Sequence, residues 1–201
     1  VTLGYIPSGQ EKWFLDLVLI GTLCDSMVLD EVNRMLSFYG MKVLKKTKRP
    51  GLIELLKAAR ANKINSETIG FQLGPRLNAG GRMESAEISL KLLMSENHQE
   101  ANRLAIKLNE LNQERRENQR QAISEIEAPE EAVIVVSGKW HEGVLGIIAG
   151  RLVEKYHKPA FVLSEVEEGV LKGSGRSFGD FNLAEALKYC ESVIIGGGGH
   201  A

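Results

Sequence analysis

Hydrophobic residues in the first half of the chain recur at helical spacing. The apolar segment 11–23, EKWFLDLVLIGTL, has few polar interruptions and predicts a buried helix. Residues 31–44 predict an amphipathic helix, because apolar residues recur at spacings of three or four: Val32, Met35, Leu36 and Tyr39. Shorter helices are expected over 52–60 and 85–94. The stretch GFQLGPRLNAGGR, residues 70–82, carries too many glycines to be regular throughout.

The longest periodic segment covers residues 99–126. Leu104, Leu108 and Leu111 mark an apolar stripe, but after Gln113 the sequence becomes polar all round, as ERRENQRQ. A helix with this pattern is typical of a solvent-exposed bridge between domains. We therefore expect one continuous helix that connects two lobes able to shift relative to one another, with a domain boundary on it.

The second half of the chain has a different pattern. Short apolar runs rich in β-branched residues predict strands at 132–137, 160–164, 170–174 and 192–196, and helices are expected over 144–156 and 183–188. Strands that alternate with helices over about 70 residues indicate a small α/β domain. The predicted organisation is a first domain over 1–97, a connecting helix over 98–128 and an α/β domain over 129–201.

Composition sets broad limits on function. The 201 residues are 43% hydrophobic and 25% charged, with a formal net charge of -1, which is ordinary for a globular protein and argues against a uniformly basic nucleic-acid coat. A local basic segment, residues 41–63, nevertheless holds eight lysines and arginines against the single acid Glu54. Such a segment can bind phosphates or can be a solvated surface, and charge alone leaves both interpretations open.

The two cysteines, Cys24 and Cys190, stand in apolar surroundings without CxxC spacing, which favours reduced thiols and a cytoplasmic protein. No apolar run approaches the roughly 18 residues of a membrane span, and no export signal follows Val1. A start without Met and a terminal GGGGHA suggest a piece of a longer chain.

Glycine-rich stretches around arginines are the first candidates for chemistry. In KGSGRS, residues 172–177, small residues flank Arg176; glycine lets a ligand approach the backbone, serine hydroxyls donate, and the guanidinium is a bidentate fork for phosphate. A plain turn is the alternative. RLNAGGR adds Arg76, Asn78 and Arg82, with a loop whose arginines pair with acids such as Glu84 as its alternative.

The segment WHEGVLGIIAGRL, residues 140–152, starts a predicted helix. His141 is either a cap of this helix or a ligand contact, and Arg151 lies two turns further on. Gly146 and Gly150, four residues apart, are expected to permit close packing of the helix on the sheet.

Two further features could serve a reaction. Asp25 ends an apolar segment, which suits both a metal ligand and a helix terminus, and one carboxylate alone cannot make a metal site. GGGGHA places Gly198 and Gly199 directly before His200, after a predicted buried strand. The four histidines are scattered, and no HxxxH or HExxH pair occurs.

Seven segments occur in an order that resembles the bacterial RecJ family of single-stranded-DNA-specific exonucleases, in the DHH phosphoesterase superfamily. These are LDLVLIGTLCDSMVL, RPGL, GFQLGPRLNAGGR, LNELNQERR, WHEGVLGIIAGRLVEKY, KGSGRS and GGGGHA. The resemblance covers nearly the whole chain. It implies an α/β fold: the end of a DHH catalytic domain (1–97), a connecting helix (98–128) and a DHH-associated substrate-binding domain (129–201).

The resemblance also implies a function. It indicates a metal-dependent 5′-to-3′ exonuclease of DNA repair and recombination that uses Mn²⁺ or Mg²⁺, with Asp25 as metal ligand and Asp25 and His200 as catalytic residues. The implied substrate-binding residues are Arg76, Asn78, Arg82, His141, Arg151, Ser174, Arg176, Ser177, Gly198 and Gly199. Arg176 and Ser174 would hold a 5′-phosphate, with Arg76 and His200 around it. The Asp-His-His triplet and earlier aspartates of the family are absent, so we expect this chain alone to be inactive.

Other functions stay open at this point. One is a DHH-family oligoribonucleotide or cyclic-dinucleotide phosphodiesterase, and another is a non-catalytic nucleic-acid-binding module. The expected partner is single-stranded DNA with a 5′ end, with a single-strand-binding protein or a helicase as a further partner and no membrane.

Overall fold

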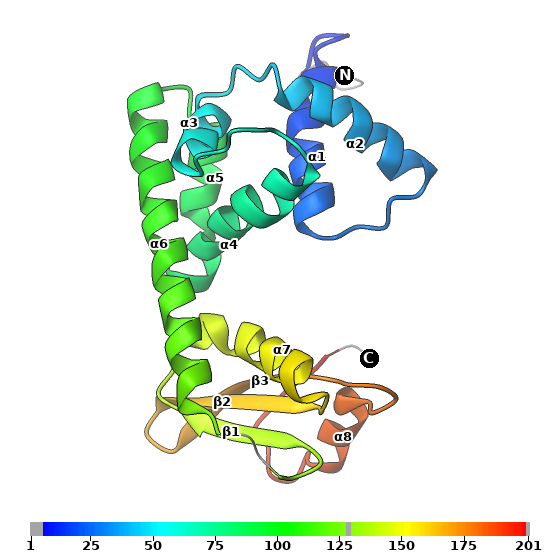
Figure 1. Ribbon diagram of the computed structural model, residues 1–201, viewed down its shortest axis with the longest axis vertical. Coiled ribbons are helices and arrows are strands. Elements are labelled where there is room, and N and C mark those ends of the chain that lie inside the picture. The colour runs from blue at the N-terminus through cyan, green and yellow to red at the C-terminus, as the bar shows by residue number, and fades with distance from the viewer. Residues whose placement is uncertain (1–5, 128–129, 200–201) are drawn as a thin grey trace. The chain divides into compact units, whose positions relative to one another are not determined.

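The computed structural model describes residues 6–127 and 130–199 and divides the chain into two compact units, Val1–Gln113 and Glu114–Ala201 (Figure 1). The first unit is helical and the second contains a sheet, so the predicted α/β class with a helix-rich first part is confirmed. Among the described residues, no helix is both long and apolar enough to cross a membrane.

The first unit consists of short helices around one apolar core. In chain order they are the 3-10 helix Glu11–Phe14, α1 (Leu15–Cys24), α2 (Glu31–Leu44), α3 (Pro50–Ala58), the π-helix Thr68–Leu73, α4 (Gly74–Met83), α5 (Ala86–Met94) and the first part of α6 (His98–Glu125). Fully buried leucines from α1, α3, α5 and α6 form the centre of the core: Leu19, Leu52, Leu55, Leu92 and Leu108.

Helix α2 has the predicted limits but not the predicted orientation. Its N-terminus is capped by Asp30, whose Oδ1 accepts a hydrogen bond from Asn33 N at 2.8 Å. It packs on α1 through Gly40, where an added Cβ would lie 2.5 Å from Leu15 O. Of the predicted apolar stripe, Leu36 is half-buried, whereas Val32, Met35 and Tyr39 are exposed in the described part of the chain. Close helix contact selects the small residue, and the bulkier apolar residues remain on the outer side.

Helix α1 is also less buried than its composition suggests. The predicted segment 11–23 is divided into a 3-10 turn and α1, and α1 buries Leu19 and Ile20 on one side. Trp13, Phe14 and Val18 are exposed. The expectation of a buried helix is therefore wrong for one of its faces.

The glycine-rich residues 70–82 are helical throughout, which corrects the expectation of an irregular stretch. The π-helix continues directly into α4. An added Cβ would lie 2.7 Å from Cys24 Sγ at Gly74 and 3.1 Å from Leu108 Cδ2 at Gly80. These glycines therefore allow α4 to pack closely on α1 and α6, and they do not break the helix.

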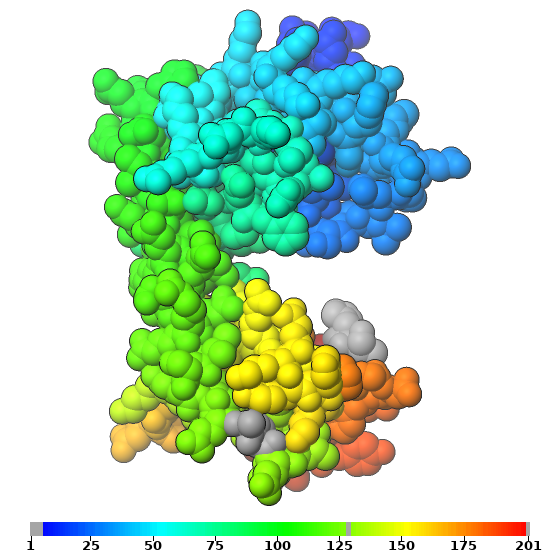
Figure 2. Space-filling model, in the orientation of Figure 1, coloured from blue at the N-terminus to red at the C-terminus, as the bar shows by residue number. Residues whose placement is uncertain are grey.

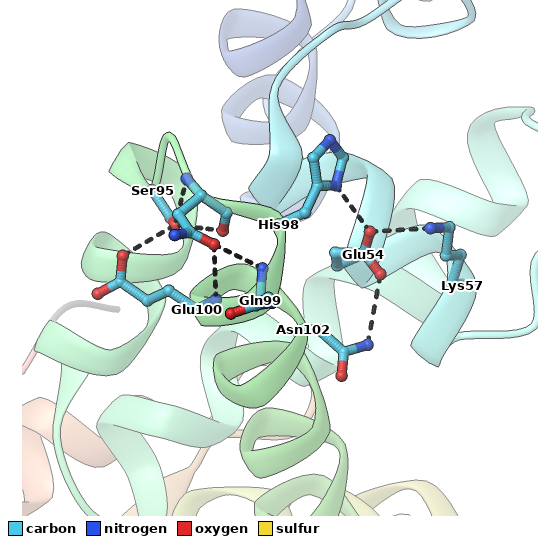
Figure 3. A network of polar contacts seen from close by, with 8 residues as sticks. Glu54, Lys57, Ser95, His98, Gln99, Glu100 and Asn102 are labelled. Atoms are coloured by element: carbon cyan, nitrogen blue, oxygen red, sulfur yellow. Dashed lines mark hydrogen bonds and ion pairs between the residues drawn. The ribbon is translucent and has the colours of Figure 1, made fainter.

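A buried carboxylate ties α3 to the start of α6 (Figure 3). Glu54 is 5% exposed and contacts Lys57 Nζ at 2.8 Å, His98 Nδ1 at 2.9 Å and Asn102 Nδ2 at 3.4 Å. The hydrogen bond from Lys57 is the main cause that lowers the pKa of Glu54, with His98 and Asn102 adding to it against the effect of burial. Glu54, the one acidic residue of the basic segment 41–63, therefore has a structural role: it joins α3 to α6.

Helix α6 is continuous from His98 to Glu125, as predicted. Leu104, Leu108 and Leu111 pack on the core of the first unit, whereas Arg116 is exposed. The division between the two units falls inside this helix, after Gln113; Figure 2 shows the atoms of the chain coloured by residue number. The domain limits at 97/98 and 128/129 stay predictions.

The second unit contains β1 (Ile134–Gly138), β2 (Ala160–Glu167) and β3 (Val170–Arg176), in the order β1-β2-β3, together with the 3-10 turn Glu142–Val144, α7 (Leu145–Tyr156) and α8 (Leu183–Tyr189). β1 is parallel to β2 and β3 is antiparallel to it. The crossover helix α7 lies along the sheet and contacts β2 and β3 (Figure 1). It buries Leu145, Ile148 and Leu152.

The strand expected over 192–196 does not form. Val193 is 81% exposed and Ile195 is 94% exposed, and no neighbouring strand pairs with this run in the described part of the chain. A β-branched run needs a paired edge and a surface to cover, and residues 192–196 have neither here.

Candidate functional site

The KGSGRS stretch is the end of a strand, and the alternative of a plain turn is therefore wrong. In the antiparallel pairing, Gly173 lies opposite Leu163 and Gly175 opposite Phe161. Cross-strand partners share one face of the sheet. A side chain at Gly175 would overlap Leu183 and lie 2.6 Å from the Phe161 ring, so the glycines leave room for these two large neighbours.

The alternate residues of β3 point to the other face of the sheet. Ser174 pairs with Val162 and Arg176 with Ala160, both of which are fully buried on the face that α7 covers. At Gly146, in the first turn of α7, an added Cβ would lie 3.0 Å from Ser174 Oγ and 3.4 Å from Arg176 Nη2. β3 and α7 therefore bring Ser174 and Arg176 together over Gly146.

These two side chains have unused hydrogen-bonding capacity. Arg176 Nη1 donates to the Gly175 carbonyl at 2.9 Å, and its guanidinium has no acidic partner within the described residues. The Ser174 hydroxyl is half-buried and makes no hydrogen bond in the same part of the chain. An exposed guanidinium beside a serine hydroxyl is suited to bind an anionic oxygen group such as phosphate.

Lys172 extends this row of residues along β3. Its Nζ lies 2.6 Å from Glu142 Oε2, just before α7. The hydrogen bond and the charge of Lys172 lower the pKa of Glu142. His141 is the N-terminal cap of the turn that precedes α7, because its Nδ1 accepts from Gly143 N at 3.1 Å. Of its two interpretations, the structure shows the cap.

Three other candidates of the second unit have different surroundings. Arg151 is 59% exposed in its side chain and pairs with Glu154 at 2.7 Å. Ser177 Oγ accepts a hydrogen bond from Leu183 N at 3.2 Å, before α8. Gly198 and Gly199 are exposed and outside regular structure, and His200 lies outside the described residues.

In the first unit, α4 separates the members of RLNAGGR. Arg76 donates from Nε to Asn109 Oδ1 at 3.0 Å and from Nη1 to the Gln72 carbonyl at 2.8 Å. Asn78 and Arg82, four residues apart, share an exposed face of α4 that differs from the face of Arg76. The structure therefore gives Arg76 a role inside the fold and leaves Asn78 and Arg82 on the surface.

Asp25 is the C-terminal cap of α1 and is exposed. Among residues 6–127 and 130–199, no group of three or more His, Cys, Asp or Glu side chains could hold a metal ion. The described residues therefore do not by themselves make a metal site around Asp25. Burial raises the pKa of neighbouring Cys24 to about 11, which keeps this thiol protonated and unreactive.

Part of the basic segment lines a cavity of about 670 Å³ in the first unit, with Trp13, Lys46, Lys48 and Arg49 in its wall. Arg49 is engaged there, because its Nε lies 3.2 Å from the buried Asp16 and its guanidinium stacks on Phe14 at 4.8 Å. The structure shows a structural role for Arg49, and both interpretations of the remaining cations stay open.

Two residues beside Ser174 and Arg176, Lys172 and Gly146, were not among the residues predicted to bind substrate. The strand periodicity of two could have found Lys172, because residues 172, 174 and 176 share a face once the stretch is taken as a strand. Gly146 was expected to allow close packing of the helix on the sheet. The structure shows this close approach, and the neighbouring side chains are the polar residues Ser174 and Arg176. Gly150 does not, since an added Cβ there would meet nothing within 4 Å.

The chain is similar to proteins of one family. Residues 130–201 match the DHHA1 domain. The single-stranded-DNA-specific exonuclease RecJ of Bacillus subtilis (strain 168) is 42% identical over 208 residues, which cover 98% of this chain and 26% of that protein. Crystal structures of RecJ from Thermus thermophilus with Mg²⁺ and with Mn²⁺ superpose with TM-scores of 0.88 and 0.87 at 30% identity, covering 99% of this chain in both cases.

The chain spans about a quarter of the curated relative and about a third of the solved chains. Within that span the match to RecJ proteins continues through both units. The predicted resemblance to the RecJ family is therefore confirmed along nearly all of this chain, with the DHHA1 domain at residues 130–201.

Proposed function

We propose that this chain is part of a metal-dependent 5′-to-3′ exonuclease that degrades single-stranded DNA in repair and recombination. In this proposal, residues of the chain bind the 5′ end of the DNA strand. The observation that carries the proposal is the pair Ser174 and Arg176 on β3, whose donors have no acidic partner in the described part of the chain. A terminal phosphate carries the charge and the oxygens that a guanidinium and a hydroxyl recognise.

The other predicted substrate-binding residues enter the proposal with different support. Asn78 and Arg82 are exposed on α4, where they can contact a nucleic-acid backbone. For Arg76, His141, Arg151 and Ser177, the hydrogen bonds within the fold are an alternative to a ligand contact. Gly198, Gly199 and His200 are proposed on the resemblance alone.

The metal chemistry is proposed for a complete RecJ-type polypeptide. The solved relatives are described in complex with Mg²⁺ or Mn²⁺, and Asp25 is the residue of this chain assigned to that site by resemblance. Because the described residues provide no co-ligands around Asp25, no catalytic step follows from them.

We expect the purified 201-residue chain to show no metal-dependent nuclease activity. The measurement is release of nucleotides from end-labelled single-stranded DNA with Mn²⁺ or Mg²⁺ present. Robust degradation that Asp25→Ala abolishes would show that the chain contains a complete site.

The family alternatives differ in ligand. A phosphodiesterase for oligoribonucleotides or cyclic dinucleotides would favour short ribonucleotides, and a non-catalytic module would bind strands without regard to the chemistry of their ends. Partners such as a single-strand-binding protein or a helicase, and a cytoplasmic location, belong to the same proposal and rest on the resemblance.

The deciding experiment compares ligands on this chain by fluorescence anisotropy. We expect a 5′-phosphorylated single-stranded DNA to bind more tightly than the same strand with a 5′-hydroxyl or a 3′-phosphate, and more tightly than a dinucleotide or cyclic dinucleotide. Equal binding of all strand ends, or tighter binding of the ribonucleotides, would overturn the proposal in favour of one of the alternatives.

A further inference from the structure

Gly146 lies beside the proposed phosphate-binding pair, although it carries no functional group. It is the second residue of α7 and faces β3. Ordinary van der Waals contacts of a Cβ lie at 3.4–4 Å, so an alanine here would press on Ser174 Oγ at 3.0 Å and touch Arg176 Nη2 at 3.4 Å. Ser174 Oγ and the Arg176 guanidinium therefore border the space that a side chain at position 146 would enter.

Of the two glycines of α7, Gly146 is the one beside the β3 pair in the described part of the chain. Gly150 is one turn further along α7, and an added Cβ there would meet no atom within 4 Å. Packing therefore does not require a glycine at position 150. The two glycines share a helix and a sequence spacing but differ in what they touch.

Helix propensity works against glycine at position 150, in the interior of α7, and less so at position 146, in its first turn. Replacing glycine by alanine in a helix interior stabilises the helix by about 0.8–1.0 kcal/mol when the site has room. Relief of a contact a few tenths of an ångström too short needs only a shift of a serine hydroxyl and of the end of an arginine. An alanine at 146 would therefore leave the fold intact and move the two groups that bind the ligand.

We propose that Gly146 is a positioning residue, which sets the preference of this site for a terminal phosphate by leaving the room in which Ser174 Oγ and the Arg176 guanidinium take their positions. The inference rests on the proposed function, since it takes the β3 pair as the phosphate site. Recognition by a rigid fork depends on placement to within about 0.5 Å, so a small displacement lowers phosphate binding more than it lowers strand binding in general.

The test measures the affinity ratio between 5′-phosphorylated and 5′-hydroxyl oligonucleotides for the 201-residue chain. For Gly146→Ala we expect the ratio to fall about 3- to 10-fold, in line with the loss of roughly one hydrogen bond, and Gly146→Val to abolish it. Gly150→Ala is the matched control and should keep the wild-type ratio. Thermal unfolding should show both alanine variants at or above the wild-type Tm.

The outcomes separate the inference from the function on which it rests. An unchanged ratio in Gly146→Ala and Gly146→Val, with a clear preference in the wild type, overturns the role of Gly146 alone. A wild-type chain without any phosphate preference overturns the proposed function and the inference together. A fall in Tm that tracks the fall in ratio across the three variants would make Gly146 a packing residue only.

Discussion

Two arginine-containing, glycine-rich stretches look alike in the sequence and differ in the fold. GPRLNAGGR is the helix α4, in which Arg76 donates to Asn109 and to the Gln72 carbonyl. KGSGRS is the end of strand β3, in which Arg176 has no acidic partner in the described chain. In both stretches the glycines leave room for large neighbouring side chains. The stretches differ in the arginine: Arg76 makes hydrogen bonds to other parts of the first unit, whereas Arg176 bonds only to the neighbouring Gly175 carbonyl among the described residues.

This difference shows what a glycine-rich context indicates. Gly80 makes room for Leu108 under α4, and Gly175 makes room for Phe161 and Leu183 under β3. Glycine in such a stretch therefore indicates that a neighbouring side chain packs closely against the backbone. The ligand hypothesis depends on the residues between the glycines and on the face they share.

The largest effect is expected for Arg176. Arg176→Ala should remove one or two charge-assisted hydrogen bonds to a 5′-phosphate, each worth about 1.5–3 kcal/mol, and so weaken binding of phosphorylated strands by about ten-fold or more. Strands with a 5′-hydroxyl should bind almost as before, and Arg176→Lys should recover little because an ammonium lacks the planar fork. Equal loss for both strand ends in the anisotropy assay would make Arg176 a general backbone contact.

Replacing a glycine of β3 by alanine should lower the free energy of unfolding more than replacing a glycine of α4. Gly175→Ala should destabilise the second unit by about 1–3 kcal/mol, because its side chain would overlap Leu183 and the Phe161 ring. The matched variant in α4 is Gly81→Ala, whose Cβ would lie 3.3 Å from the Ala86 Cβ, and it should be close to neutral. Urea unfolding of both variants checks this order, and a larger loss for Gly81→Ala would contradict it.

Arg76 should behave as part of the fold. Arg76→Ala should lower the free energy of unfolding of the first unit by about 1–2 kcal/mol, since it leaves Asn109 Oδ1 without this donor. A double-mutant cycle with Asn109→Ala should show that the two losses are not additive. An additive cycle with normal stability, together with a lowered phosphate preference, would instead favour the ligand contact predicted from the sequence.

The smallest effect concerns Glu54. Because its pKa is lowered in the folded chain, its contribution is present above the pKa of an unfolded glutamate, about 4.3, and is lost as the pH falls through the lower folded value. Glu54→Gln should therefore destabilise the first unit by about 1 kcal/mol at about pH 7 and by less at about pH 3. A loss that is the same at both pH values would show that the charge of Glu54 does not matter.

Much of the secondary structure could be predicted from periodicity and end signals. The limits of α2 follow from Asp30 and its spacing, and α6 follows from its leucine stripe. The orientation of α2 could not be predicted, because Gly40 gives closer contact with α1 than the bulkier stripe does. The run 192–196 has strand propensity, but pairing depends on a neighbouring edge that local sequence does not encode.

Of the candidate site, the residue types could be predicted from the sequence, but most of the partners of these residues could not. Ser174 and Arg176 were candidates from residue type, and strand alternation explains why their side chains lie on the same face of β3. The partner of Arg76 could not be predicted, since Asn109 lies 33 residues away. Arg151 pairs with Glu154 three residues further along α7, and this surface pair is an alternative to a ligand contact. The proposed role of Gly146 could not be predicted from the sequence, because it depends on the side chains of β3 that lie beside α7.

The most direct test observes the guanidinium of Arg176 itself. In a ¹⁵N NMR titration of side-chain Nε–H groups, a 5′-phosphorylated trinucleotide should shift the Arg176 signal to saturation. The signal of Arg120, which pairs with Glu117 on the surface of α6, should stay in place. A trinucleotide with a 5′-hydroxyl should leave both signals unchanged. An Arg176 signal that does not move, or that moves equally with both trinucleotides, would contradict the account of β3 as the phosphate-binding strand.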